Sequence, residues 1–186
     1  MKPHRVAFAL SLLLAACAGG PAAAPAAAAP QPGACTVLGA MPPPALLAEL
    51  RALQQGLPKA PLYAAAAGWG LSDCSIEAPA DGPARLTYRF RDGSLFWLQR
   101  DPRIELLEQH AEFAREPPAD ALRVLAAADK AAYGEQGCAI DWQAPETRTG
   151  AGGTDQIYRG QTCNCQARVR RNALGRITAL ALKSTC

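Results

Sequence analysis

Residues 85–100 read RLTYRFR-DG-SLFWLQR, two runs of alternating apolar and polar residues on either side of an Asp-Gly pair at 92–93. Such alternation is typical of a half-buried strand, because successive side chains point to opposite faces of a sheet. Asp-Gly between two such runs favours a two-residue type I′ hairpin. This register places Tyr88 opposite Trp97 on an apolar face, which we expect to pack on the core, and leaves Phe96 on the other, mixed face.

A second hairpin is expected near the C-terminus. Residues 157–169 and 176–183 have the pattern of its two strands, with Asn172-Ala-Leu-Gly175 as the turn between them, although the pattern does not fix the register. Upstream, Cys138–Trp142 is typical of a short strand, and the polar Gly- and Thr-rich residues 143–154 are typical of a loop.

Three helices are expected in addition to these strands. The first covers residues 44–55, with proline in its first turn and leucines at i, i+4 and i+7. The second covers residues 101–115 and opens with Asp-Pro, and the third runs from the prolines at 117–118 to Tyr133. Residues 63–67 could add another helical turn. The predicted fold is α+β: an antiparallel sheet built from two hairpins, with about three helices on one face, stapled by disulfides.

Two short motifs indicate a possible internal duplication. Cys74-Ser-Ile-Glu-Ala-Pro and Cys138-Ala-Ile-Asp-Trp-Gln-Ala-Pro lie 64 residues apart, and each is expected to follow a helix and precede a hairpin. Two similar halves sharing a sheet would explain both motifs. Chance recurrence of so short a motif is the alternative.

The N-terminus has the pattern of an export signal. Lys2 and Arg5 precede a short apolar run, and Leu14-Ala15-Ala16-Cys17 resembles the lipobox at which bacterial lipoproteins are cleaved and acylated. The resemblance implies cleavage before Cys17, a diacylglycerol on its sulfur and a further acyl chain on its amino group. The alternative is an ordinary secretory signal that is cut later, within the Ala-rich run.

These features divide the chain into three parts. Residues 1–16 form the expected signal peptide, residues 17–34 a lipidated cysteine with an Ala/Pro-rich tether, and residues 35–186 a single domain. The apolar run of nine residues would span about 14 Å, roughly half of a bilayer core, which is too short for a transmembrane helix. Because alanine follows Cys17, we expect an outer-membrane anchor with the domain on the periplasmic face.

The cysteine count agrees with this assignment. With Cys17 used for lipid, an even number remains for disulfides in an oxidising compartment, namely Cys35, Cys74, Cys138, Cys163, Cys165 and Cys186. We expect a Cys35–Cys74 bond in the first half and the other four cysteines bonded among themselves. Zinc sites require two spaced Cys pairs or Cys/His sets, and neither spacing occurs, so no metal or other cofactor is predicted.

Cys163-Asn-Cys165 carries an alternative function. If the segment were a strand, the two sulfurs would lie on one face, and a bond between them would close a small, strained ring. Strained disulfides are oxidising, which suits a thiol–disulfide exchange protein. No helix N-terminus, the usual place for a reactive thiolate, is predicted there.

Catalytic patterns are few. His110, the only histidine outside the signal, is expected at the core edge of the second helix, and a role as a base or ligand is the alternative. Four acids recur there at helical spacing as a solvated face, or alternatively as the carboxylates of an envelope hydrolase: Glu105, Glu108, Glu112 and Glu116. No hydrolase elbow, zinc-protease motif or phosphate-binding glycine loop occurs. Catalysis is therefore not predicted.

The C-terminal segment is basic. From residue 158 onward it has no acidic side chain and carries Arg159, Arg168, Arg170, Arg171, Arg176 and Lys183. Export argues against nucleic acid as the partner, which leaves an envelope protein or an anionic glycolipid, and a solvated face or an internal acidic helix as alternatives. The sequence predicts a lipid-anchored binding or assembly module of the cell envelope rather than an enzyme.

Overall fold

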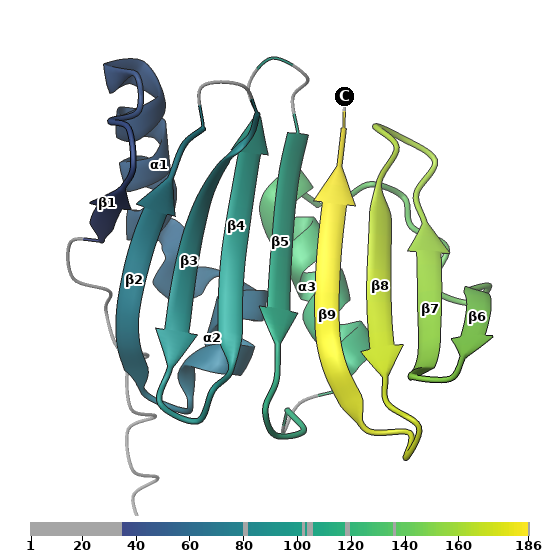
Figure 1. The fold of residues 1–186 in the computed structure, drawn as a ribbon. Helices are drawn as coiled ribbons and strands as arrows, with labels where there is room; N and C mark the ends of the chain where they lie inside the picture. The colour runs from purple at the N-terminus through teal and green to yellow at the C-terminus, as the bar shows by residue number, and fades with distance from the viewer. Residues whose placement is uncertain are drawn as a thin grey trace, which may run out of the picture.

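The computed structural model describes residues 35–79, 82–101, 103, 106–117, 120–135 and 137–185. They form a nine-stranded sheet of order β1-β2-β3-β4-β5-β9-β8-β7-β6 (Figure 1). The strands are β1 (Thr36–Leu38), β2 (Leu71–Glu77), β3 (Ala84–Phe90), β4 (Leu95–Asp101), β5 (Leu106–Glu112), β6 (Glu146–Gly150), β7 (Gly153–Arg159), β8 (Gln166–Arg171) and β9 (Ile177–Ser184). The β1–β2 pair is parallel and every other pair is antiparallel.

The helices lie together on one face of the sheet (Figure 1). They are α1 (Pro44–Gly56), the 3-10 turn η1 (Leu57–Lys59), α2 (Pro61–Ala67) and α3 (Ala121–Tyr133). Prolines begin α1 and α2, and the Asp120 side chain caps α3 by accepting a hydrogen bond from the Arg123 backbone N–H at 2.9 Å. The predicted α+β class is confirmed. No helix in the described part of the chain is long and apolar enough to cross a bilayer.

The sheet differs from the predicted pair of hairpins. Residues 101–115 were expected to form a helix, but they contain β5, which pairs with β4 and β9 at the centre of the sheet. Residues 143–154, expected as a loop, contribute to the β6–β7 hairpin. The single strand expected at 157–169 is β7 followed by β8, and Cys138–Trp142 forms only one isolated bridge, between Ile140 and Gly160.

The hairpin of β3 and β4 is also shifted by one residue from the predicted register. The Phe90 N–H bonds to the Ser94 carbonyl at 2.9 Å, and Gly93, at φ +91°, closes a three-residue loop. In this loop type a glycine takes the left-handed position. A one-residue shift moves every side chain of the second strand to the other face. Phe96 therefore lies opposite Tyr88 in the core, and Trp97 lies on the other face.

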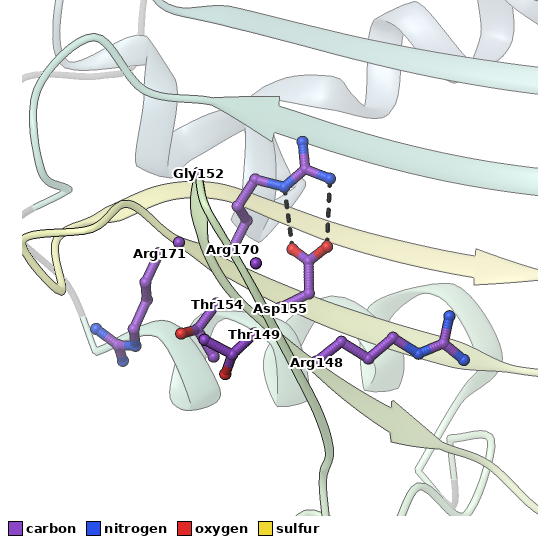
Figure 2. Close-up of a pocket in the computed structure, with 9 residues that line it drawn as sticks. Arg148, Thr149, Gly152, Thr154, Asp155, Arg170 and Arg171 are labelled. Atoms are coloured by element: carbon purple, nitrogen blue, oxygen red, sulfur yellow. Dashed lines mark hydrogen bonds and ion pairs between the residues drawn. The ribbon is translucent and has the colours of Figure 1, made fainter.

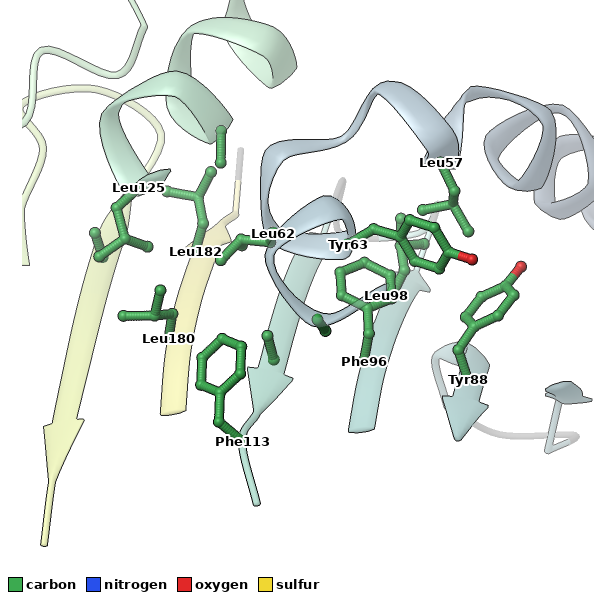
Figure 3. Close-up of a cluster of buried hydrophobic side chains, with 14 of the residues drawn as sticks. Leu57, Leu62, Tyr63, Tyr88, Phe96, Leu98, Phe113, Leu125, Leu180 and Leu182 are labelled. Carbon is green, nitrogen blue, oxygen red and sulfur yellow. The ribbon is translucent and has the colours of Figure 1, made fainter. Parts of the chain in front are cut away.

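An aromatic cluster joins α2 to the N-terminal strands. Tyr63 lies between Tyr88 and Phe96, with ring centroids 5.4 and 5.5 Å away (Figure 3). Both contacts are edge-to-face, the geometry that aromatic quadrupoles favour. All three rings are fully buried. This cluster fixes α2 on one face of the sheet, and no helix of the described residues lies on the other face.

Two similar halves meet at the centre of the sheet. Each consists of helix followed by four antiparallel strands, β2–β5 after α1 and α2, and β6–β9 after α3. The last strands of the two halves, β5 and β9, pair with each other. This arrangement agrees with the hypothesis of duplication. Each half contains a disulfide between described residues: the predicted Cys35–Cys74 bond is confirmed, as is a bond within the other set, Cys138–Cys165.

Candidate functional site

The sheet face without helices, which we call the open face, is the strongest candidate site (Figure 1). Its residues alternate with the core residues along each strand, and the register aligns them in rows across the sheet. Its charged and aromatic members include Asp73, Arg85, Arg89, Trp97, Glu108, His110, Glu112, Asp155, Arg159, Arg168, Arg170 and Lys183.

Three side chains form a stack at the centre of the open face. The rings of Trp97 and His110, which are direct partners on β4 and β5, are nearly parallel, at 7°, with centroids 4.7 Å apart. The Arg85 guanidinium lies 4.8 Å from the Trp97 ring centroid, within the range of a cation–π contact. We call these three residues the Arg85–Trp97–His110 stack. It presents a planar, partly exposed, pre-ordered surface.

The setting of His110 favours its neutral form. Its side chain is 15 % exposed, and its Nε2 lies 3.2 Å from Glu112 Oε1. Burial lowers the pKa of His110 below its ordinary value, an effect that Glu112 and Glu108 oppose and that Arg170 reinforces. The residue was expected on a helix at the core edge. It lies instead on a strand, on the face opposite the main core.

The acids around His110 belong to the same strand. Glu108 and Glu112 point to the open face on either side of His110, and Glu108 lies 3.8 Å from Lys183. The predicted helical row of acids is therefore wrong. Glu105 lies outside the described residues. Among the residues that are described, no group of three His, Cys, Asp or Glu side chains could hold a metal ion.

The basic C-terminal residues do not form one patch. Arg159 bonds to Glu146 at 2.8 Å, and Arg170 binds Asp155 through two hydrogen bonds of 3.0 and 3.3 Å. These carboxylates lie in the β6–β7 hairpin, which the sequence did not predict. As predicted, Arg168 and Arg170 share one face.

Three of the basic residues take no part in these ion pairs: Arg168, Arg171 and Arg176. Arg171 donates to the Gly175 carbonyl at 3.1 Å. Arg168 and Arg176 form no ion pair within the described ranges. The hydrogen bond from Arg170 lowers the pKa of Asp155, and the positive charge of Arg168 adds a smaller effect in the same direction. Of the predicted anion-binding residues, Arg168 is thus the one on the open face without an ion pair there.

A polar pocket of about 410 Å³ adjoins the tip of the β6–β7 hairpin (Figure 2). Arg170 and Asp155 form their ion pair in its wall, while Arg171 points away from that pair. Arg148 also lines the pocket and binds Glu146 through its Nε at 2.7 Å. Asp155 neutralises Arg170, while Arg148 shares the Glu146 carboxylate with Arg159, so the ion pairs offset only part of the positive charge of the pocket.

The Cys163–Cys165 pair predicted for a redox site is not formed. Cys165 bonds to Cys138, and Cys163 is disulfide-bonded to another cysteine, which lies outside the described residues. Cys163 and Asn164 take left-handed backbone angles, φ 51° and 43°, in a turn before β8 rather than in a strand. Cys17 and Cys186 lie outside the described residues, so the lipidation prediction is not addressed by the structure.

Sequence reasoning missed the stack because it assigned Trp97 to the core. The available signal was the glycine at 93, which is compatible with a three-residue loop that turns Trp97 outward. Comparison of the chain with protein families, curated proteins and solved structures finds no match. The candidate site therefore rests on its own geometry.

Proposed function

We propose that this protein is a lipid-anchored, non-catalytic binding module of the bacterial cell envelope, and that it holds an acidic protein partner on the open face of its sheet. The observation that carries the proposal is the Arg85–Trp97–His110 stack at the centre of a sheet face that no described helix covers. Tryptophan and arginine are enriched among the residues that dominate protein–protein binding energy.

The shape of the open face favours a protein surface. Ala179 and Ala181 lie between the β5 row and the β8 row, with Ala181 directly between His110 and Arg168. Their short side chains leave a low strip beside the stack. A partner side chain placed over this strip would contact the imidazole on one side and the guanidinium on the other. A pocket of about 310 Å³, lined by Glu112, Arg170 and Ala179 among others, adjoins this strip.

The charges of the open face favour an acidic partner. Lys183 Nζ lies 3.8 Å from Glu108 Oε2, and Arg89 Nε lies 3.8 Å from Asp73 Oδ1. Arg170 is paired with Asp155. By contrast, Arg85 donates only to the neutral Gln99 side chain, at 2.8 Å, and Arg168 forms no ion pair, in the part of the chain that is described. Arg85 is the cation at one end of the stack, and Arg168 lies beyond Ala181 at the other end. Carboxylates on a partner would gain charge-assisted hydrogen bonds there.

The proposed anchor suits this role. Residues 18–34 in an extended form would reach about 50 Å at ~3.1 Å per residue, far enough to let the domain search for a partner away from the bilayer. Two or three acyl chains on Cys17 give a lasting anchor, since one chain binds only marginally. Mass spectrometry of the mature N-terminus is expected to show residue 17 first, carrying diacylglycerol. An unmodified Cys17, or residues 1–16 still attached, would contradict the anchor.

Site-specific photo-crosslinking tests the binding face. A photo-reactive amino acid at Arg89 samples the open face, and one at Lys130 samples α3, where the side chain has a similar exposure, 53 % against 55 %. The expected result is an adduct with one acidic envelope protein from position 89 alone. An adduct with lipopolysaccharide, or equal adducts from both positions, would overturn the proposal.

Binding of the purified partner then tests the stack itself. Trp97→Ala is expected to weaken affinity by about thirtyfold, the effect of removing a central aromatic anchor. Arg85→Glu should weaken it as well, mainly by slowing association at low salt. Arg176→Glu is the matched charge reversal, because Arg176 is exposed in the β8–β9 turn, and it should leave affinity unchanged. Equal effects of the two reversals would mean that net charge, and not the stack, drives binding.

A further inference from the structure

We propose that a groove on the helix side of the sheet binds a small, uncharged and mainly apolar molecule that carries a hydroxyl or an N–H group. The groove has a volume of about 480 Å³. It lies where the two halves meet, between α1–η1 on one side and α3 on the other, with residues of β4 and β5 as its floor. The site is separate from the open face, so it stands or falls independently of the proposed function.

The walls of the groove are apolar. Leu53 and Leu57 line it from the first half, Ala132 lines it from α3, and Leu98 and Leu107 form part of the floor. Ligand pockets commonly have volumes between about 300 and 1,000 Å³ and are lined mainly by apolar side chains with a few polar groups. The alanines of α3 leave the space, because larger side chains on this helix would fill the gap between α3 and α1–η1.

Gln109 places one polar group within this apolar floor. The residue is on β5, opposite Leu98, and is only 9 % exposed. Its Oε1 is buried and accepts no hydrogen bond from any group in the described residues. A buried acceptor without a donor is unfavourable relative to an apolar side chain of similar size. We infer that a bound molecule supplies the missing donor.

The remaining polar groups define the ligand further. Glu49 lines the groove, but its carboxylate is held by Arg100 Nε at 2.7 Å. Lys59 also lines the groove and is exposed. An unpaired acceptor such as Gln109 Oε1 repels a carboxylate and attracts an O–H or N–H group. The carboxamide offers a donor as well as an acceptor, which matches an alcohol or amide better than a hydrocarbon without polar atoms.

The test uses the full mature protein and two fluorescent probes. N-phenyl-1-naphthylamine is apolar and carries one N–H donor, and its N-methylated analogue has the same rings without the donor. The first probe is expected to bind saturably with one site and more tightly than the second. Gln109→Leu should weaken binding of the first probe by about threefold to tenfold, the range for one hydrogen bond, and leave the second unchanged or slightly tighter.

The second variant blocks the groove with a larger side chain. Ala132→Phe projects a ring into the groove and should weaken both probes at least tenfold, whereas Ala127→Phe makes the same change at an exposed position of α3 outside the groove and should weaken neither. Should Ala132→Phe fail to fold, the difference between the two probes on wild type and on Gln109→Leu still decides the matter. Absence of saturable binding, or equal losses for both probes in Gln109→Leu, would overturn the proposal.

Discussion

In the N-terminal half, β2–β5 pack beneath α1 and α2 around a cluster of buried aromatic rings, whereas in the C-terminal half β8 and β9 pack beneath α3 mainly through aliphatic side chains, among them Leu125, Val169, Leu180 and Leu182. The outermost strands also differ. β6 is exposed at all five positions, and the strands beside it are joined by ion pairs and lie next to the Cys138–Cys165 bond. Both halves have a buried apolar core and a disulfide, but aromatic rings dominate the first core, and cross-strand ion pairs join the outer strands of the second half.

Truncation of the aromatic core is expected to have the largest effect. Phe96→Ala should lower the free energy of unfolding by about 3–5 kcal/mol, because the ring is fully buried and leaves a cavity. Val169→Ala is the matched change in the C-terminal half and should cost less, since a smaller side chain is removed. Urea unfolding measures both. The control on the same strand is Trp97→Ala, and a larger loss there than for Phe96→Ala would contradict the register of β3 and β4.

Removal of a disulfide is expected to have the next largest effect. Replacing both Cys138 and Cys165 by serine opens a loop of 27 residues and should cost about 3–4 kcal/mol on the chain-entropy scale. Hydrogen exchange should show that amides of β7 and β8 lose protection before those of β3 and β4. Uniform loss across both halves would contradict the difference between them.

Disulfide mapping sharpens the same comparison. The Thr185 N–H donates to the Cys163 carbonyl at 2.9 Å. Thr185 is the residue before Cys186, and Cys163 is disulfide-bonded. We therefore expect Cys163–Cys186 as the third bond and no free thiol after mild reduction of the native protein. A Cys163–Cys165 bond, or a reactive thiol, would revive the thiol–disulfide exchange alternative.

The pH dependence of stability tests the environment of His110 on β5, the strand that pairs with β9 where the two halves meet. Because the folded state lowers the pKa of His110 below 6.5, the unfolded state binds more protons, and stability should fall as the pH drops from 6.5 through the lower folded value. His110→Gln should remove this slope above the range in which carboxylates titrate. An unchanged slope in the variant would assign it to other groups.

The smallest effects are expected from surface ion pairs. Asp155→Asn breaks the pair with Arg170 and should cost about 0.2–1 kcal/mol at low salt and almost nothing at high salt. Asp73→Asn is the counterpart in the N-terminal half. Its carboxylate is more exposed, 65 % against 26 %, and lies 3.8 Å from Arg89, so the change should cost less. A larger loss of stability for Asp73→Asn than for Asp155→Asn would contradict the greater role of ion pairs in the C-terminal half.

Local signals in the sequence were enough for much of the fold. Proline at the start of α1 and the turn at Asn172–Gly175 each depend on neighbouring residues only, and both were predicted. The start of α3 was predicted at the prolines 117–118, whereas the helix begins at Ala121, after its Asp120 cap. The Cys35–Cys74 bond was also predicted. The predictions failed where contacts with residues distant in the sequence determine the secondary structure. The apolar spacing around His110 suits a helix, but β5 is flanked by two strands whose pairing satisfies its backbone.

The candidate site was out of reach for the same reason. The Trp97–His110 contact depends on the register of two hairpins, and an error of one residue at Gly93 places Trp97 in the core. The β6–β7 hairpin gave no apolar pattern, because β6 is exposed throughout. Its carboxylates, which neutralise Arg159 and Arg170, were therefore missing from the interpretation of the basic segment.

The exposed β6 edge has a consequence for how these molecules behave when crowded. Its outer backbone groups pair with no strand in the described part of the chain, so the ladder could in principle continue into a neighbouring molecule. Two antiparallel copies joined symmetrically about the middle of β6 would place Arg148 directly against its counterpart. Such like charges face to face are destabilising. Arg148 at the centre of the last strand thus disfavours this symmetric extension of the sheet, to the extent that Glu146 leaves its charge uncompensated.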